Sequence, residues 1–541
     1  MSRLFHLRAA RVAACAALLT LAGTASAQFD PAKVVVEPAP IAAQFPDPAA
    51  TFDTPAFTGD RRDFTSHAEM AAFVEKLRRG SGRVEIETMG RSQEGRAMLL
   101  LVISGKAGFD PSLPTVMLLG QQHGNEPAGG EAALAVARQL AVVRSDLLER
   151  VNVLVIPRGN PDAAEHFARV STDGTDVNRD HLLLRTPEVQ AIAATVRRYR
   201  PQVMLDMHEF TVAGRWVDKF GSFMRYDALL QAANTGNLNP EVHRLQARYL
   251  SASRTAIEAR GQRVSDYFTT SSDAHQKAVS MGGVNVDTGR NVGGLRNAVS
   301  ILLETRGVGL GRAHLARRVE AHVAAAMGVI ELAAQDGFGL VASTRDAGTA
   351  TAAQACRGDM AVAVRQTPER RTLQFLNAGT GEPREIEVDW RSSTTLQTTS
   401  WRNRPCGYLI DAGQKSAVDR LLTLGVAANV VVNPDKTHAW STEAYEILTD
   451  ASGQRQDARG AIEDGQGIRV LTVKTMHSDL APRAGSYFIS MDQPLAGLVS
   501  AALEPDSQNS FAANRLIEID RQQLRRVGIP PDPGSFLPYR P

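Results

Sequence analysis

A histidine and a carboxylate stand three residues apart where an apolar run gives way to a helical pattern. His123 and Glu126 lie within residues 120–129, between an apolar run at 116–119 and a helical pattern that begins near residue 131. The end of a buried strand is the usual ligand-binding position in an open α/β sheet. A catalytic zinc site needs two histidines and one carboxylate and leaves a fourth position for water. The pair therefore predicts two of the three zinc ligands.

Two further apolar runs end in residues that suit the same chemistry. His208 ends one of them and is the candidate third ligand, with Asp206 or Glu209 placed to orient neighbouring groups. Glu304 ends the other, and a carboxylate there is costly unless it has a function or a partner. A third candidate ligand and a further carboxylate are thus predicted at the ends of two more strands.

A polar loop before His208 carries an amide next to a guanidinium. Asn178 and Arg179 follow Gly174-Thr175-Asp176-Val177 in this loop. A planar guanidinium fork beside an amide is suited to holding a carboxylate. The loop is therefore a candidate site for a substrate carboxylate.

Strands and helices alternate through the segment that carries these residues. Apolar strands are expected at residues 97–103, 115–119, 152–156, 203–206 and 299–303, and helices at 131–143, 187–199, 241–259 and 312–334. This alternation predicts an α/β fold, with a mixed, largely parallel twisted sheet covered by helices on both faces. Functional side chains of such a fold gather at strand ends along one edge.

The N-terminal residues have the pattern of a secretory signal peptide. Three arginines precede a short apolar run, and Ala25-Ser26-Ala27 predicts cleavage after Ala27. Residues 28–60 are proline-rich and are expected to form a linker or arm. No later run is expected to be long and apolar enough to span a membrane, so an exported, soluble protein is predicted. The formal net charge of +2 gives no reason to expect nucleic acid as a partner.

The character of the sequence changes near residue 337. Residues 61–336 are predicted to form the catalytic domain, and 337–541 a smaller α+β or β-rich domain that carries no clustered ligands. Cleavage of the signal peptide leaves Cys356 and Cys406, which in an oxidising compartment form either a disulfide or two separate buried thiols.

In this order, His123-x-x-Glu126, Asp176-Val177-Asn178-Arg179, His208 and Glu304 resemble the motifs of the M14 zinc carboxypeptidases. The resemblance spans about residues 63–334, includes Gly90-Arg91-Ser92-x-Glu94-Gly95-Arg96, and leaves the C-terminal domain outside the family's core.

The resemblance implies a role for each matching residue. His123, Glu126 and His208 would bind one zinc ion per chain, with Asp176 accepting a hydrogen bond from His123. Glu304 would be the general base and then the acid, and Arg169 would stabilise the oxyanion. Asn178 and Arg179 would hold the terminal carboxylate of a peptide substrate.

The chain also departs from the family pattern. The substrate-facing tyrosine has no clear match, since Tyr267 lies 304 − 267 = 37 residues before Glu304. Residues 280–296 are expected to line the pocket. Arg290 and Arg296 in that segment favour an acidic substrate side chain, unless they are exposed loop charges.

The alternative is a zinc amidohydrolase similar to succinylglutamate desuccinylase and aspartoacylase, which would cleave N-acyl amino acids. Those enzymes are typically cytosolic, and the signal peptide and Glu304-Thr305-Arg306-Gly307 argue against this alternative. A non-catalytic binding protein would require a broken site, and every expected position is filled. The expected partner is therefore a peptide or acyl-amino-acid substrate.

Overall fold

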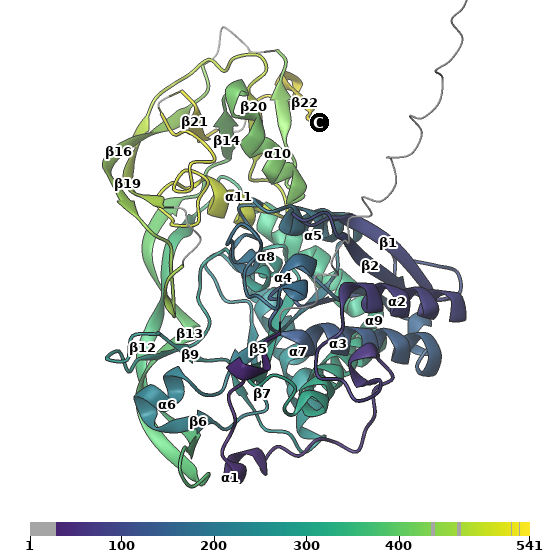
Figure 1. Ribbon diagram of the computed structural model, residues 1–541. Coiled ribbons are helices and arrows are strands. Elements are labelled where there is room, and N and C mark those ends of the chain that lie inside the picture. The colour runs from purple at the N-terminus through teal and green to yellow at the C-terminus, as the bar shows by residue number, and fades with distance from the viewer. Residues whose placement is uncertain (1–28, 434–438, 463–466, 521, 530, 541) are drawn as a thin grey trace, which may run out of the picture.

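The computed structural model describes residues 29–433, 439–462, 467–520, 522–529 and 531–540 (Figure 1). The predicted signal peptide, residues 1–27, lies outside the described residues. Sheets of eight, five and seven strands and one two-stranded hairpin organise the described chain.

The eight-stranded sheet holds the strands that were expected to carry the site. Its order is β1-β2-β4-β3-β5-β11-β7-β8. The four middle strands β4, β3, β5 and β11 run parallel, while β2 and β7 join them antiparallel, which confirms the predicted mixed sheet. The strands are β1 Val84–Arg91, β2 Ala97–Ile103, β3 Thr115–Gly120, β4 Asn152–Ile156, β5 Val203–Thr211, β7 Ala228–Ala232, β8 Val264–Asp266 and β11 Val299–Val308.

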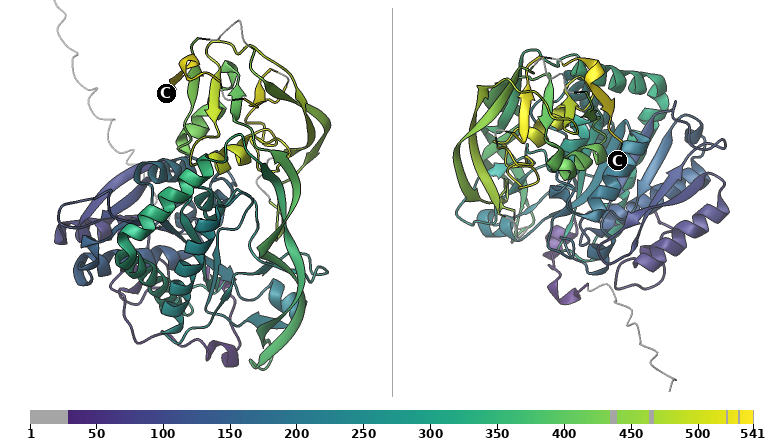
Figure 2. Two further views of the ribbon diagram at one scale, coloured as in Figure 1. Left: turned by 180° about the vertical axis from the view of Figure 1, so that it is seen from behind. Right: turned by 90° about the horizontal axis from the view of Figure 1, so that it is seen from above.

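Helices cover both faces of this sheet (Figures 1 and 2). Because side chains alternate along a strand, Val116 and Leu118 of β3 pack on one face and Met117 and Leu119 on the other. The first face packs against α2, α3, α7 and α9, and the second against α5 and α8. These helices are α2 His67–Gly80, α3 Pro127–Arg138, α5 Pro187–Tyr199, α7 Pro240–Glu258, α8 Gly289–Leu295 and α9 Leu315–Ala352.

Helix α9 is longer than predicted. It was expected to end at residue 334, but it continues through a kink at Gly337 to Ala352 because Leu340 and Ala347 are also buried. It is long and apolar enough to cross a membrane, which corrects the expectation that no later segment would be. Half of the most apolar 18-residue stretch of α9 is buried inside the protein, and the helix packs against α3, α7 and β11 as a core helix.

A long two-stranded ribbon follows α9 and runs along one side of residues 61–336, which are called the catalytic segment below (Figure 1). Its strands are β12 (Asp359–Asn377) and β13 (Pro383–Asn403), in the region that was expected to be α+β or β-rich. The ribbon joins a five-stranded sheet of order β6-β12-β13-β10-β9, with β6 Ser222–Met224, β9 Thr269–Thr270 and β10 Val279–Ser280. Aromatic residues of both segments, including Trp216, Phe268, Phe375 and Trp390, form its core with α6 (Arg215–Phe220).

The seven-stranded sheet builds the rest of the C-terminal region. Its order is β19-β16-β21-β14-β20-β15-β22, with helices α10 (Lys415–Thr423) and α11 (Ala496–Leu503) beside it. The strands are β14 Gly407–Ile410, β15 Asn429–Val431, β16 Thr442–Gly453, β19 Ile468–His477, β20 Tyr487–Ser490, β21 Leu524–Val527 and β22 Phe536–Pro538. Leu182 and Leu183 of the catalytic segment belong to the same hydrophobic core, so the two regions share packing. The domain boundary at residue 337 stays a prediction.

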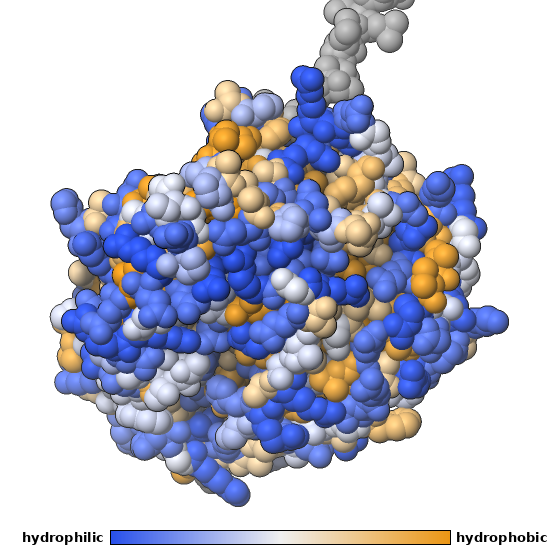
Figure 3. Space-filling model, turned by 90° about the horizontal axis from the view of Figure 1, so that it is seen from below, coloured by the Kyte–Doolittle hydropathy of each residue, from blue (hydrophilic) through white to orange (hydrophobic). Residues whose placement is uncertain are grey.

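Two further contacts fix the ends of these segments. A disulfide joins Cys356, just after α9, to Cys406, just before β14. In the proline-rich arm, Ile41 of α1 (Ala39–Ala42) and Phe45 are buried, and Glu37 forms a buried ion pair with Arg306 of β11. Figure 3 shows the face seen from below, where the surface is mostly hydrophilic with scattered hydrophobic side chains.

Candidate metal centre and active site

The turn between β3 and α3 carries His123 and Glu126. Glu126 immediately precedes α3, and Pro127 occupies its first position, where the fixed φ of proline suits a helix. The turn passes so close to α4 (Pro161–Glu165) that a Cβ on Gly124 would lie 1.8 Å from the carbonyl oxygen of Ala163. Glycine is therefore required there for the turn to hold both side chains in place.

His208 and Glu304 come from neighbouring parallel strands. His208 lies in β5 directly opposite Glu304 in β11, and Gly120 at the end of β3 lies opposite Met207 on the other side of β5. Three adjacent strands thus bring together residues that lie about 80 to 180 positions apart in the sequence. His208 and Glu304 were expected at strand ends, but β5 continues to Thr211 and β11 to Val308, so both residues lie within their strands.

Three buried side chains converge at this edge. The Nδ1 atoms of His123 and His208 lie 2.9 and 2.8 Å from the two carboxylate oxygens of Glu126. The same two Nδ1 atoms are 3.1 Å apart. All three ligand atoms lie within 4.8 Å of one another.

This arrangement fits zinc. Two Zn–N bonds of about 2.0–2.1 Å at a tetrahedral angle place the nitrogens roughly 3.3 Å apart, close to the observed separation. A further pair of carboxylates lies behind the histidines. Nε2 of His123 is 3.0 Å from Asp176 Oδ1, and Nε2 of His208 is 2.8 Å from Asp206 Oδ1. An Nε2 proton donated outward leaves the Nδ1 lone pair facing inward, which a metal ligand needs.

Arg169 lies on the inward side of the cluster. Its Nη1 is 3.2 Å from Glu126 Oε1 and 3.3 Å from His123 Nδ1, while its Nη2 donates to Asp176 Oδ2 at 2.9 Å. Burial alone would raise the pKa of Glu126, but the adjacent histidines hold it well below its usual value. The site therefore presents an ionised carboxylate beside a fixed guanidinium.

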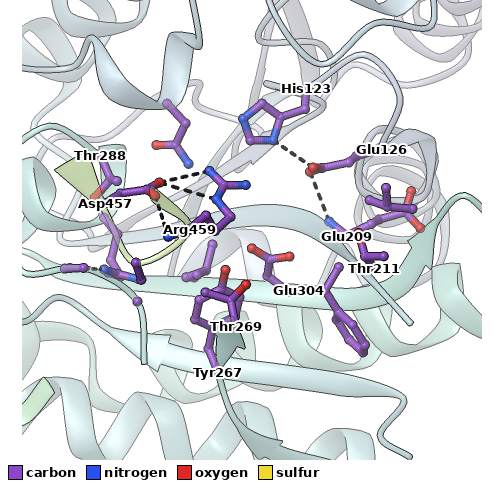
Figure 4. A pocket seen from close by; sticks show the side chains of 18 of the residues that line it. His123, Glu126, Glu209, Thr211, Tyr267, Thr269, Thr288, Glu304, Asp457 and Arg459 are labelled. Carbon is purple, nitrogen blue, oxygen red and sulfur yellow. Dashed lines mark hydrogen bonds and ion pairs between the residues drawn. The ribbon is translucent and has the colours of Figure 1, made fainter. Parts of the chain in front are cut away.

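Glu304 faces the same space without a partner. Its carboxylate makes no hydrogen bond or ion pair with any residue that the structure describes, and Figure 4 shows it below His123 and Glu126. Burial and the nearby Glu126 carboxylate raise the pKa of Glu304 to about 7. A carboxyl group poised near neutral pH is suited to taking and returning a proton.

Comparison with known proteins agrees with this geometry. Residues 70–184 match the family model of the zinc carboxypeptidases. Carboxypeptidase 2 of Trichophyton rubrum is 30% identical over 469 residues, which cover 84% of this chain and 85% of the relative. The chain belongs to the M14 zinc carboxypeptidase family. Members of this family are zinc-dependent peptide hydrolases.

The likeness to these fungal enzymes is not confined to the catalytic segment. Carboxypeptidase 2 of Trichophyton equinum is likewise 30% identical over 468 residues. This alignment is longer than the whole segment before residue 337, so it extends into the C-terminal region. Among solved structures, a metallo-carboxypeptidase from Burkholderia cenocepacia covers 50% of this chain and 69% of its own, at 19% identity and a TM-score of 0.38.

Tyr267 lines the pocket of this carboxypeptidase, although its distance in sequence from Glu304 suggested otherwise. The chain folds back between β8 and β9, and the Tyr267 amide donates to the carbonyl of Leu230 in β7, the neighbour of β11. Tyr267 and Glu304 therefore line the same pocket (Figure 4). Burial and the Glu304 carboxylate raise the pKa of Tyr267 to about 12, so the phenol keeps its proton.

The proposed carboxylate-binding pair is in the pocket wall, and both side chains have protein partners. Arg179 donates from Nη2 to Asp457 Oδ2 at 2.7 Å and from Nη1 to the carbonyl of Asn178 at 2.7 Å. The amide oxygen of Asn178 accepts from the Gly289 amide at 2.9 Å, and its Nδ2 lies 3.1 Å from His208 Nε2. Their roles toward substrate stay predictions.

Arg290 also lines the pocket, as expected from its segment. Its Nη2 donates to the carbonyl of Gly283 at 2.8 Å and its Nε to Asn291 Oδ1 at 3.3 Å. Burial lowers the pKa of Arg290 to about 10. The guanidinium thus braces the loop around Gly283, and a preference for acidic side chains stays a prediction.

Three pocket residues from the C-terminal region, Asp457, Ala458 and Arg459, were not predicted. Asp457 and Arg459 lie on a short hairpin that enters the pocket opposite His123 and Glu304 (Figure 4). The nearest sequence signal was a charged Asp-Ala-Arg-Gly turn, which is indistinguishable from an exposed hairpin tip.

Proposed function

We propose that the chain is an exported zinc exopeptidase that removes the C-terminal residue of peptides. The observation that carries the proposal is the convergence of His123, Glu126 and His208, with Glu304 one strand away. These are the groups that a metal-assisted hydrolysis needs: three ligands, and a carboxylate that is free to accept a proton.

His123, Glu126 and His208 would hold one zinc ion per chain. When bound, zinc polarises the scissile carbonyl and makes its coordinated water acidic. Asp176 and Asp206 keep the two histidines in the orientation in which their Nδ1 lone pairs face the centre.

Glu304 is the proposed general base and then the general acid. It accepts a proton from the attacking water and delivers it to the nitrogen of the leaving amine. Arg169, whose Nη1 lies beside the ligand atoms, stabilises the negative charge that develops on the carbonyl oxygen. The hydroxyl of Tyr267 stays protonated and can donate a hydrogen bond within the pocket.

The preference for a chain terminus is assigned to the Asn178 and Arg179 end of the pocket. Guanidinium groups bind carboxylates through charged hydrogen bonds worth roughly 1.5–3 kcal/mol each. Export is supported by the signal-peptide pattern and by the Cys356–Cys406 disulfide, because disulfides persist in oxidising compartments.

The test compares blocked dipeptides that have a free or an amidated C-terminus. We expect the free acid to be cleaved at least tenfold faster in kcat/KM, using about 1.4 kcal/mol per decade. The variant Arg179→Ala should lose most of that preference, while Arg79→Ala, an exposed arginine of α2, should keep it.

Equal cleavage of both peptides would refute the exopeptidase assignment. Faster cleavage of N-acyl amino acids than of any peptide would instead identify an amidohydrolase.

A further inference from the structure

A hairpin of the C-terminal region forms one wall of the active-site pocket. β17 (Gln456–Asp457) pairs with β18 (Gly460–Ala461), and Ala458 and Arg459 form the tip between them. Asp457, Ala458 and Arg459 line the same pocket as Glu304 and Tyr267. In Figure 4, Arg459 extends from beside Asp457 toward the space between His123 and Glu304.

The hairpin is fixed to both regions of the protein. Buried Arg455, just before it, donates to the carbonyl of Arg179 at 2.6 Å. The backbone of Gln456 bonds the side chain of Gln508 at 2.9 and 2.8 Å and accepts from Asn285 at 3.1 Å. These hydrogen bonds fix the position of the hairpin tip, so its side chains can form part of a binding site.

One carboxylate bridges two guanidiniums in this wall. Asp457 Oδ2 accepts from Arg179 Nη2 at 2.7 Å and from Arg459 Nη2 at 3.2 Å, and its Oδ1 accepts from the Arg459 backbone amide at 2.7 Å. Although burial opposes it, the two arginines lower the pKa of Asp457 to about 2, so it is ionised at neutral pH.

The two guanidiniums differ in what they can still bind. Arg179 has 12% of its side chain exposed, and its Nη1 and Nη2 both have protein acceptors. Arg459 has 28% exposed, and its Nη1 has no hydrogen-bond partner among the described residues. Its Nη2 lies 4.0 Å from Asp176 Oδ2, which places the group close to the proposed metal centre.

We propose that Arg459 binds the terminal carboxylate of the substrate, alongside Arg179, and that Asp457 is the positioning residue that holds the two guanidiniums together. The inference rests on the proposed exopeptidase function and deepens it, because it makes the C-terminal region part of the substrate-binding site. A carboxylate in the pocket would pair with the Nη1 side of Arg459 and share the positive charge of the two guanidiniums.

The alternative is that Arg459 only stabilises the hairpin by pairing with Asp457. A purely structural role predicts that its removal affects all substrates equally, since hairpin stability does not depend on the substrate's end group. A role in recognition predicts a loss confined to substrates with a free carboxylate.

The experiment uses the full chain with zinc bound and measures kcat and KM on matched free-acid and amidated peptides. For Arg459→Ala we expect KM on the free acid to rise about tenfold, which corresponds to about 1.4 kcal/mol, with kcat within about twofold and the amidated peptide unaffected. Arg459→Lys, which keeps the charge but not the fork, should lie between the wild type and the alanine variant. Arg469→Ala, which breaks a pair with Asp450 elsewhere in the C-terminal region, is the control and should match the wild type.

An unchanged ratio of free-acid to amidated cleavage in Arg459→Ala would overturn the proposal. If Arg459→Ala does not fold, as judged by thermal unfolding, the ratio measured for Arg459→Lys decides. Failure of the exopeptidase function is distinguishable, because the wild type itself would then show no preference.

Asp457→Asn tests the positioning role. We expect KM on the free acid to rise and kcat to hold, since both guanidiniums lose their common anchor. A lower KM would show instead that Asp457 competes with the substrate for Arg179, and would overturn its positioning role.

Discussion

The carboxylates behind the two histidines give the sharpest test of the proposed metal centre. Asp176 Oδ1 accepts from His123 Nε2 and from the Asn178 amide, both at 3.0 Å, while Oδ2 pairs with Arg169 at 2.9 Å. The variant Asp176→Asn keeps the shape but replaces one oxygen with an NH2 group. That group faces either the imidazole proton or the guanidinium, so one contact is lost in either orientation of the amide.

The expected size of the effect follows from these contacts. Loss of such an outer partner costs 10–100-fold in metal affinity, or about 1.4–2.7 kcal/mol. Asp206→Asn should fall at the lower end of this range, because its partners besides His208 are the neutral amides of Gln122 and Asn178. Asp176→Asn should fall at the upper end, because it also loses its ion pair with Arg169.

The assay is competition for zinc against a chelator of known affinity, with Asp450→Asn as the control from a surface ion pair. Thermal unfolding of the metal-free variants separates a folding defect from a binding defect. Zinc dissociation constants within about twofold of the wild type for both aspartate variants would refute the proposed support of the histidines.

Three further predictions address catalysis, the turn and the disulfide. Glu304→Gln should lower kcat on the order of 10²–10⁴-fold with zinc retained. Because the ionised carboxylate is the base, kcat/KM of the wild type should rise with pH, and its midpoint should lie below about 7 because bound zinc favours the ionised form. A flat pH profile would contradict this role. Gly124→Ala should destabilise the fold by several kcal/mol, since its Cβ would lie 1.8 Å from a backbone oxygen, whereas Gly82→Ala, with open space around it, should leave the melting temperature within about 1 °C. Replacing Cys356 and Cys406 by serine should lower the free energy of unfolding by roughly 4 kcal/mol for a 50-residue loop, and an unchanged urea midpoint would show that the disulfide adds nothing.

The central fold could be predicted because its signals are local. Strands such as β3 and β4 are short apolar runs, and the helices between them have clear periodicity. The end of α9 could not be predicted, because a glycine at residue 337 suggests that the helix ends there. The helix continues because burial of Leu340 in the tertiary structure stabilises the next turns. The length of the ribbon could not be predicted for a similar reason, because its two strands are stabilised by pairing with each other.

The residues of the candidate site likewise fall into those that have a local sequence signal and those that do not. His123, His208 and Glu304 were found because each follows an apolar run in the sequence, although β5 and β11 continue past His208 and Glu304. Tyr267 was discounted because distance along the chain is a poor guide where the chain folds back onto β7. Arg459 could not be predicted, since its hairpin lies more than 150 residues after Glu304 and reads in the sequence like any exposed charged turn.

The disulfide between Cys356 and Cys406 turns the long ribbon into a closed covalent ring. Its outer turn, between Asn377 and Pro383, contains exposed residues of the kind that proteases cut. A cut there leaves both fragments attached through the sulfur bridge. The nicked enzyme would migrate as one species on a non-reducing gel and as two after reduction. Such a two-chain form would keep β13 paired with β12, and the pocket hairpin with it.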